Sequence, residues 1–227
     1  MQKTFESPHL RNSEFVFTDR EDAGRQLGDM LQEETAKDGL LLAIPSGGVP
    51  VAAAMQFFVR WPMELLLVRK VQIPYNTEAG FGAVNMDGER FFNQKLLDTL
   101  HLSWEVVESQ VQKALRTIEQ RNTLFRCGKP FPDITDKNVI IVDDGLASGY
   151  TMLAAIHFVQ SRKPATITIA VPTGMSDTVE NLSRKVDRLY CLNIREAYPF
   201  AVANAYRNWY DLSDKEVLNL LGRKACL

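Results

Sequence analysis

The sequence predicts an α/β fold of three layers, in which helices cover both faces of a central, mainly parallel sheet of five strands. Short apolar runs, typical of strands buried on both faces, alternate along the chain with segments whose apolar residues recur at helical spacing. Strands separated by helices indicate a parallel sheet with crossover helices. Of the 227 residues, 45% are hydrophobic and 24% are charged, which is the composition of an ordinary globular protein.

The first third of the chain begins this alternation. Thr18 and Glu21 form a capping-box pattern, and apolar residues at helical spacing then predict a helix to about Lys37, which Gly39 ends. The elements expected next are a strand at 40–44, a turn at 46–48, a helix at 49–58 and a strand at 63–68.

Residues 69–92 change in character. Pro74 and three glycines interrupt the segment, and Asp87-Gly88 is a favourable two-residue hairpin turn. A long segment rich in glycine inside an α/β pattern is more often functional than a simple connection. We expect this segment to be a lid with a hairpin.

The rest of the chain continues the pattern and ends in an aromatic tail. Asp177 with Glu180, and Ser213 with Glu216, are capping pairs for two short helices. The elements expected here are helices at 96–100, 104–125 and 150–162, strands at 138–142, 165–171 and 186–191, and a last helix to Leu221. We expect a single domain over residues 1–227, with the lid at 69–92 and a C-terminal hood at 193–227.

Composition also limits the function. The net charge of −2 offers no basic excess for a phosphate backbone, so nucleic acid is not an expected partner. No run approaches the roughly 18 apolar residues of a membrane span, and we expect a soluble, cytoplasmic protein. Cys127, Cys191 and Cys226 are widely spaced, and we expect idle thiols in a reducing compartment. The three histidines show no metal or triad spacing.

The strongest local signal is the stretch 139–151. Four apolar residues are followed by Asp143 and Asp144, then by a loop of small residues that opens a helix. Such a loop lets backbone N–H groups converge on a phosphate, to which Ser148 and Thr151 can add hydroxyl groups. Two adjacent carboxylates suit vicinal hydroxyls or a hydrated Mg²⁺. The combination describes a receptor for ribose 5-phosphate. The alternatives are a simple helix cap and the metal-binding strand of a P-loop ATPase, although no GxxxxGK[ST] motif occurs.

This stretch resembles the phosphoribosyl-pyrophosphate signature of the type I phosphoribosyltransferases. The resemblance implies that Asp143 and Asp144 hold the ribose hydroxyls and, directly or through water, Mg²⁺. It also implies a 5-phosphate site made of Ala147, Ser148, Gly149, Tyr150 and Thr151. At Ala147, hypoxanthine-guanine enzymes carry an Asp and adenine-type enzymes do not, which argues against a 6-oxopurine acceptor.

Two further segments extend the resemblance. The loop with Ser46, Gly47 and Gly48 stands where the family binds pyrophosphate, but related uncharacterised members carry an Arg in place of Ser46. Arg69-Lys70 is similar to the pair that begins the catalytic loop of orotate-type enzymes and is a candidate catalytic pair. Similarity to the uncharacterised group covers most of the chain.

The resemblance implies transfer of ribose 5-phosphate from phosphoribosyl pyrophosphate to a small nitrogenous acceptor, with Mg²⁺ as cofactor, in nucleotide metabolism. The alternatives are a sensor of the same fold that binds phosphoribosyl pyrophosphate or a nucleotide without turnover, and a hydrolase with water as acceptor. A homodimer is compatible with the resemblance, and a membrane is not an expected partner. We expect the tail aromatics to pack the hood more often than to stack on a base: Tyr198, Phe200, Tyr206, Trp209 and Tyr210.

Overall fold

The computed structural model describes residues 3–32 and 38–222 and contains the predicted parallel sheet. The sheet has six strands in the order β1-β9-β8-β7-β2-β3, and every neighbouring pair is parallel. The sequence predicts five of them, and the sixth is β1, whose two residues are too few to give a periodic signal. The strands are β1 (Thr4–Phe5), β2 (Gly39–Ala43), β3 (Met63–Leu65), β7 (Asn138–Val142), β8 (Thr166–Met175) and β9 (Arg188–Arg195).

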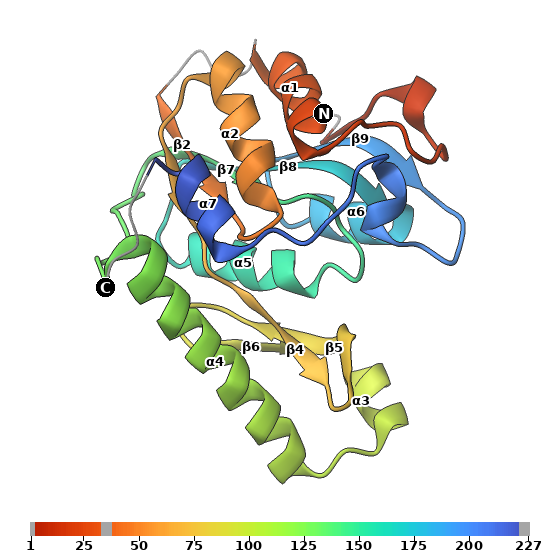
Figure 1. Cartoon of the computed structure of the whole chain (residues 1–227), viewed down its shortest axis with the longest axis vertical. Coiled ribbons are helices and arrows are strands. Elements are labelled where there is room, and N and C mark those ends of the chain that lie inside the picture. The colour runs from red at the N-terminus through yellow and green to blue at the C-terminus, as the bar shows by residue number, and fades with distance from the viewer. Residues whose placement is uncertain (1–2, 33–37, 223–227) are drawn as a thin grey trace.

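Helices cover both faces of this sheet (Figure 1). Side chains of a strand alternate between faces, so Leu41 packs with helices α1 (Arg20–Leu31) and α2 (Gly48–Val59). Its neighbour Leu42 packs with α5 (Tyr150–Gln160) and α6 (Ser176–Ser183) on the opposite face. The fold is therefore the predicted α/β arrangement of three layers.

Residues 69–92 form a separate antiparallel sheet, which lies beyond α5 in Figure 1. Its strands are β4 (Arg69–Ile73), β5 (Asn76–Val84) and β6 (Arg90–Phe92), and the predicted turn at Asp87-Gly88 joins the last two. Val71 and Phe81 are fully buried in this sheet. Helix α3 (Gln94–Leu100) follows β6, and the long helix α4 (Trp104–Arg126) packs against β4. The segment expected as a lid is thus an ordered sheet whose buried residues join the hydrophobic clusters of the main sheet.

Two of the three predicted helix caps are wrong. Asp19, rather than Thr18, precedes α1, and its carboxylate accepts a hydrogen bond from the amide of Asp22. Helix α6 begins after Met175 without a side-chain cap, and Asp177 lies inside its first turn. The capping box of Ser213 and Glu216 is confirmed at the start of α7 (Asp214–Leu220).

Several boundaries differ from the sequence prediction. Strand β9 continues to Arg195, so the first residues assigned to the hood belong to the sheet. Helix α1 ends at Leu31, and the predicted continuation over 33–37 lies outside the described residues, as do 223–227 of the hood. The tail carries one 3₁₀ turn at Val202–Ala205, and a second lies at Pro8–Leu10 near the start of the chain.

The cysteines fulfil the expectation only in part. Cys191 is a buried free thiol, and burial raises its pKa. Cys127 is disulfide-bonded, so the expectation of an idle thiol is wrong there. Cys226 lies outside the described residues. In the part of the chain that the structure describes, no helix has both the length and the apolar character to cross a membrane.

Candidate functional site

The acid pair lies where β7 ends, at the carboxyl edge of the large sheet. Asp143 accepts a hydrogen bond at its Oδ1 from the amide of Asp144, at 2.9 Å. Burial raises the pKa of Asp143 well above its usual value, and the charge of Asp144 raises it further. Burial also raises the pKa of Asp144, although Arg20 opposes that shift. The pair therefore retains a proton more readily than two exposed aspartates would.

Arg20, the first residue of α1, binds Asp144. Its Nε donates to the Asp144 Oδ2 at 2.9 Å, and only 8% of the Arg20 side chain is exposed. The guanidinium also lies 3.8 Å from the centre of the Trp209 ring and donates to the carbonyl oxygen of Tyr210. Arg20 thus links the acid pair to the C-terminal tail, a contact that the sequence does not reveal because the two partners are 124 residues apart.

A cavity of about 400 Å³ opens beside the acid pair. Lys70, Ala79 and Gly80 of the small sheet form one side of it, and Val202 of the tail forms part of the rest. The loop after β7 and the start of α5 supply the other lining residues, which are Asp143, Asp144, Gly145, Leu146, Ala147, Ser148, Gly149, Thr151 and Met152. The structure therefore brings most of the sequence-predicted site residues to one cavity, together with Val202, for which the sequence carries no signal.

The loop after β7 presents an open helix start to this cavity. Gly149, the residue before α5, has φ +79 and makes no side-chain cap. The first N–H groups of a helix have no partner within it, so an uncapped first turn offers donors to an anion. Loop geometry is held by Leu146, whose amide donates to the carbonyl oxygen of Thr173. Tyr150 packs its side chain against the hydrophobic cluster on the α5 and α6 face of the sheet and does not line this cavity.

The loop after β2 lies directly against the acid pair. A Cβ on Gly47 would lie 1.9 Å from the Asp144 Oδ2, and one on Gly48 would lie 2.5 Å from the carbonyl oxygen of Val142. These two positions therefore require glycine because of the close approach to β7. The peptide bond between Pro45 and Ser46 is cis, and the Ser46 hydroxyl accepts a hydrogen bond from Arg121 of α4.

Arg69 and Lys70, predicted as a catalytic pair, do not line the same cavity. Successive side chains of a strand point to opposite faces, so the two residues diverge from β4. Lys70 lines the acid-pair cavity, where its stem covers Gly80. Arg69 is largely buried elsewhere, and burial followed by the charge of Arg121 lowers its pKa.

The expectation that the tail aromatics pack is met for Tyr206 and, through its ring contacts, Trp209, but not for Tyr198 and Tyr210, which are exposed. Tyr206 is 1% exposed, and its hydroxyl donates to the carbonyl oxygen of Asp144 at 2.6 Å. Trp209 lies against Tyr206, with 5.2 Å between ring centroids, and covers Arg20. Tyr198 is 75% exposed. None of these rings lines the acid-pair cavity.

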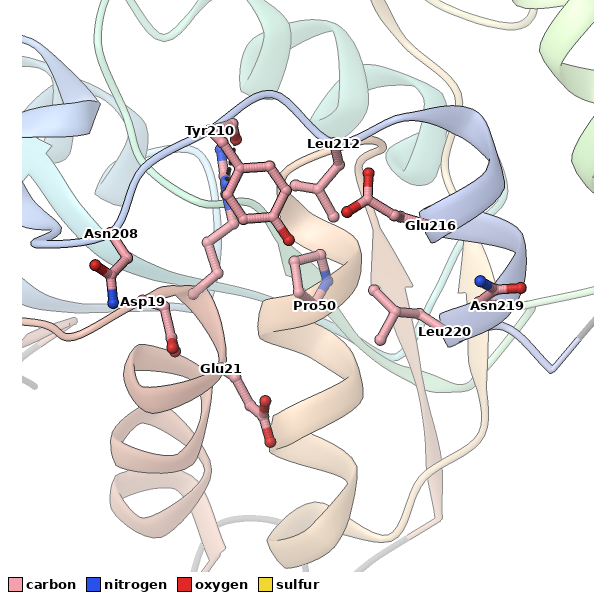
Figure 2. A pocket seen from close by; sticks show the side chains of 10 residues that line it. Asp19, Glu21, Pro50, Asn208, Tyr210, Leu212, Glu216, Asn219 and Leu220 are labelled. Carbon is pink, nitrogen blue, oxygen red and sulfur yellow. Dashed lines mark hydrogen bonds between the residues drawn. The ribbon is translucent and has the colours of Figure 1, made fainter.

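A second cavity, of about 500 Å³, lies on the other side of Arg20 (Figure 2). Figure 2 shows Asp19, which precedes α1, and Glu21 of α1 on one side of it, Pro50 of α2 in the middle, and Glu216 of α7 opposite. Tyr210 and Leu212 of the tail cover it. Asp19 and Glu216 already accept helix-capping hydrogen bonds, which limits what they can offer to a ligand.

The acid pair fits a magnesium ion whose remaining ligands are water molecules and substrate phosphates. Within residues 3–32 and 38–222, no group of three or more His, Cys, Asp or Glu side chains gathers to enclose a metal. Mg²⁺ is commonly held by one or two carboxylates together with water and substrate phosphates, rather than by a complete protein cage. Asp143 and Asp144 beside an anion-accepting loop match that chemistry.

Comparisons with known proteins are consistent with this geometry. The profile of the phosphoribosyl transferase domain family matches residues 21–204. Two curated proteins of Mycobacterium tuberculosis, "Putative phosphoribosyl transferase Rv0571c" and its MT0597 counterpart, are each 35% identical over 208 residues, or 92% of this chain and 47% of theirs. The chain thus spans about half the length of the curated relatives it matches. The crystal structure of TT1426 from Thermus thermophilus is similar with a TM-score of 0.71 and 28% identity, over 91% of this chain and 98% of that one.

Proposed function

Because the chain belongs to the phosphoribosyl transferase domain family, we propose that it transfers ribose 5-phosphate from phosphoribosyl pyrophosphate to a small nitrogenous acceptor and releases pyrophosphate. The observation that carries this proposal is the cavity in which the uncapped start of α5, the acid pair and Lys70 meet. The helix start can bind a phosphate, the acid pair can bind vicinal hydroxyls, and Lys70 can bind a second anionic group, so one cavity offers a partner for each.

Each end of the sugar phosphate has a receptor in this proposal. Backbone N–H groups of residues 147–151, with the hydroxyls of Ser148 and Thr151, bind the 5-phosphate. Asp143 and Asp144 accept hydrogen bonds from the ribose hydroxyls. The loop of Ser46, Gly47 and Gly48 receives the pyrophosphate, because it touches Asp144 and begins α2 without a side-chain cap.

The reaction is a displacement at C1 of the ribose. The bond from C1 to the pyrophosphate oxygen breaks, and the electron pair leaves with pyrophosphate. The acceptor nitrogen forms the new bond to C1 and loses its proton to solvent. The positive charge that develops on the sugar is favoured by the nearby acid pair, while Lys70 or Arg69 offsets the charge on the leaving group.

Mg²⁺, held by Asp143 and Asp144 with the ligand's own oxygens, would neutralise charge on the pyrophosphate. The small sheet and the tail close the cavity over the sugar and limit the access of water, which would otherwise compete with the acceptor. We further propose a single domain with residues 69–92 as its lid, a cytoplasmic location in nucleotide metabolism, and a homodimer as a permitted assembly.

Calorimetric titration with phosphoribosyl pyrophosphate and Mg²⁺ tests the binding half of the proposal. We expect Asp143→Asn combined with Asp144→Asn to weaken binding by about tenfold or more, because hydrogen bonds to charged groups are the strong ones. Asp133→Asn is the matched control, since this exposed carboxylate precedes β7 and therefore lies at the opposite edge of the sheet. Equal affinities in the double variant and the control would contradict the assignment of the acid pair.

Pyrophosphate release over a panel of purines, pyrimidines and small amides tests the transfer half. We expect release with at least one acceptor, and no release with hypoxanthine or guanine, because Ala147 stands at the position that faces the purine in enzymes for 6-oxopurines. Tight binding without release for any acceptor would instead identify a sensor. Release that proceeds at the same rate with water alone would identify a hydrolase.

A further inference from the structure

Arg121 reaches the loop after β2 from the middle of helix α4. Its Nη2 donates to the Ser46 hydroxyl at 3.3 Å, and its Nη1 donates to the Pro45 carbonyl oxygen at 3.5 Å. Both hydrogen bonds are longer than the 2.7–3.2 Å typical of N–H···O contacts. A guanidinium has five N–H donors in a planar fork, so long contacts of this kind can be exchanged for stronger ones to an oxyanion without moving the helix.

The charges around this loop are unbalanced. Arg69 lies in β4, against which α4 packs, and burial followed by the charge of Arg121 lowers the pKa of Arg69. Asp214, the first residue of α7, pairs with Arg121 at 3.3 Å and also attracts Arg69, but 47% of its side chain is exposed. The carboxylate that pairs with the Arg121 guanidinium is thus partly screened by solvent, and Arg121 lies beside the loop that begins α2 without a side-chain cap. This arrangement favours an additional anion at the loop.

We propose that Arg121 is the cationic group that binds the pyrophosphate at the loop of Ser46, Gly47 and Gly48. This inference rests on the proposed function and adds a residue that is distant in sequence to the site. Arg121 approaches the loop from α4, so the cation comes from an element other than the loop itself. The small Ser46 leaves room for the Arg121 side chain, which is 19% exposed.

The arrangement also explains how this chain can dispense with an arginine at position 46. The family resemblance implies such a cation within the loop, whereas here the helix would supply it to the same backbone. Arg121 is therefore a binding residue for the leaving group. It lies away from the acid-pair cavity, whose lining includes Lys70 but neither Arg69 nor Arg121.

Titration of the full chain with two separate probes tests the proposal. The probes are inorganic pyrophosphate with Mg²⁺, which occupies only the leaving-group site, and ribose 5-phosphate, which occupies only the sugar site. We expect Arg121→Gln to weaken pyrophosphate binding by about tenfold or more, as for loss of a charge-assisted hydrogen bond, and to leave ribose 5-phosphate binding within about twofold. Ser46→Arg in the Arg121→Gln background should restore most of the pyrophosphate affinity.

Arg116→Gln is the matched control, because Arg116 is exposed on the same helix and its replacement removes the same charge. Arg121→Lys, which keeps the charge, covers the case in which Arg121→Gln fails to fold. Unchanged pyrophosphate affinity in both Arg121 variants, or an equal loss for both probes, would overturn the inference. An unmodified chain that binds neither ribose 5-phosphate nor phosphoribosyl pyrophosphate would overturn the proposed function itself, so the two failures are distinguishable.

Discussion

The ionisation of Asp143 is strongly constrained by its surroundings. Burial disfavours its charged form, and Asp144 next to it adds a second negative charge that only Arg20 is seen to pair with in the described chain. A carboxyl group with a raised pKa in the folded state holds its proton after the unfolded chain has released its own. The free energy of unfolding contributed by this group therefore falls as the pH rises from the ordinary Asp pKa of about 3.8 to the raised value.

Replacement of Asp143 by Asn should remove this penalty. We expect the stability of Asp143→Asn relative to the unmodified chain to increase between pH 4 and pH 8, by roughly 1.4 kcal/mol for each unit by which the pKa of Asp143 is raised. Urea denaturation at pH 4, 6 and 8 measures the difference. A difference that stays constant or decreases with pH would show that Asp143 is not held in its protonated form.

The sequence identified the residues that are contiguous in the chain and missed those that meet only in the fold. Asp143, Asp144 and the loop to Thr151 are consecutive in the sequence, so the pattern of acids followed by small residues was enough to predict a candidate site. Arg20 and Arg121 come from helices whose surfaces are otherwise ordinary, and each contacts the site across 75 residues or more. No spacing rule relates such partners, so only the packing of α1 and α4 reveals them.

Helix α7 shows how local sequence signals act at the scale of an element. Its capping box is complete, because the Ser213 hydroxyl accepts from the amide of Glu216 and the Glu216 carboxylate accepts from the amide of Ser213. The other two predicted caps were wrong. Asp19, the neighbour of Thr18, caps α1, and no side chain caps α6. Capping patterns locate helices well, but tertiary packing decides the first residue. Strand β1 escaped prediction because two residues carry no alternation.

Ser213→Ala tests the contribution of this cap. We expect a loss of about 1 kcal/mol in the free energy of unfolding, which is the usual cost of removing an N-terminal cap. Ser176→Ala in α6 is the matched control, since that helix begins without a side-chain cap, and it should cost less. Urea denaturation of both variants gives the comparison, and equal losses would contradict the role of the Ser213 hydroxyl.

At the scale of the whole molecule, the tail returns to the start of the chain and meets the site there. Phe17 and Tyr206 pair as an isolated β-bridge, and the Tyr206 hydroxyl reaches Asp144. Arg20 holds the same region from α1 through its contacts with Trp209 and Tyr210. Residues near each end of the described chain thus contact Asp144 of the acid pair, directly or through Arg20.

Loss of the ion pair between Arg20 and Asp144 should destabilise the protein strongly. We expect Arg20→Gln to cost about 3–5 kcal/mol, because it leaves a mostly buried carboxylate without its partner. Arg25→Gln on the same helix breaks a pair with Glu21 in which both side chains are more than half exposed, and it should cost less than about 1 kcal/mol. Denaturation curves of the two variants measure the contrast. Similar losses would mean that Arg20 contributes no more than a surface ion pair.

The opposite directions of Arg69 and Lys70 have a mechanical consequence. The two side chains share one stretch of backbone, so β4 cannot move one cation without moving the other. Rotation of the strand about its own axis would therefore move the two cations in opposite directions, so the position of Lys70 at the cavity is coupled to the position of Arg69 on the other face of the strand.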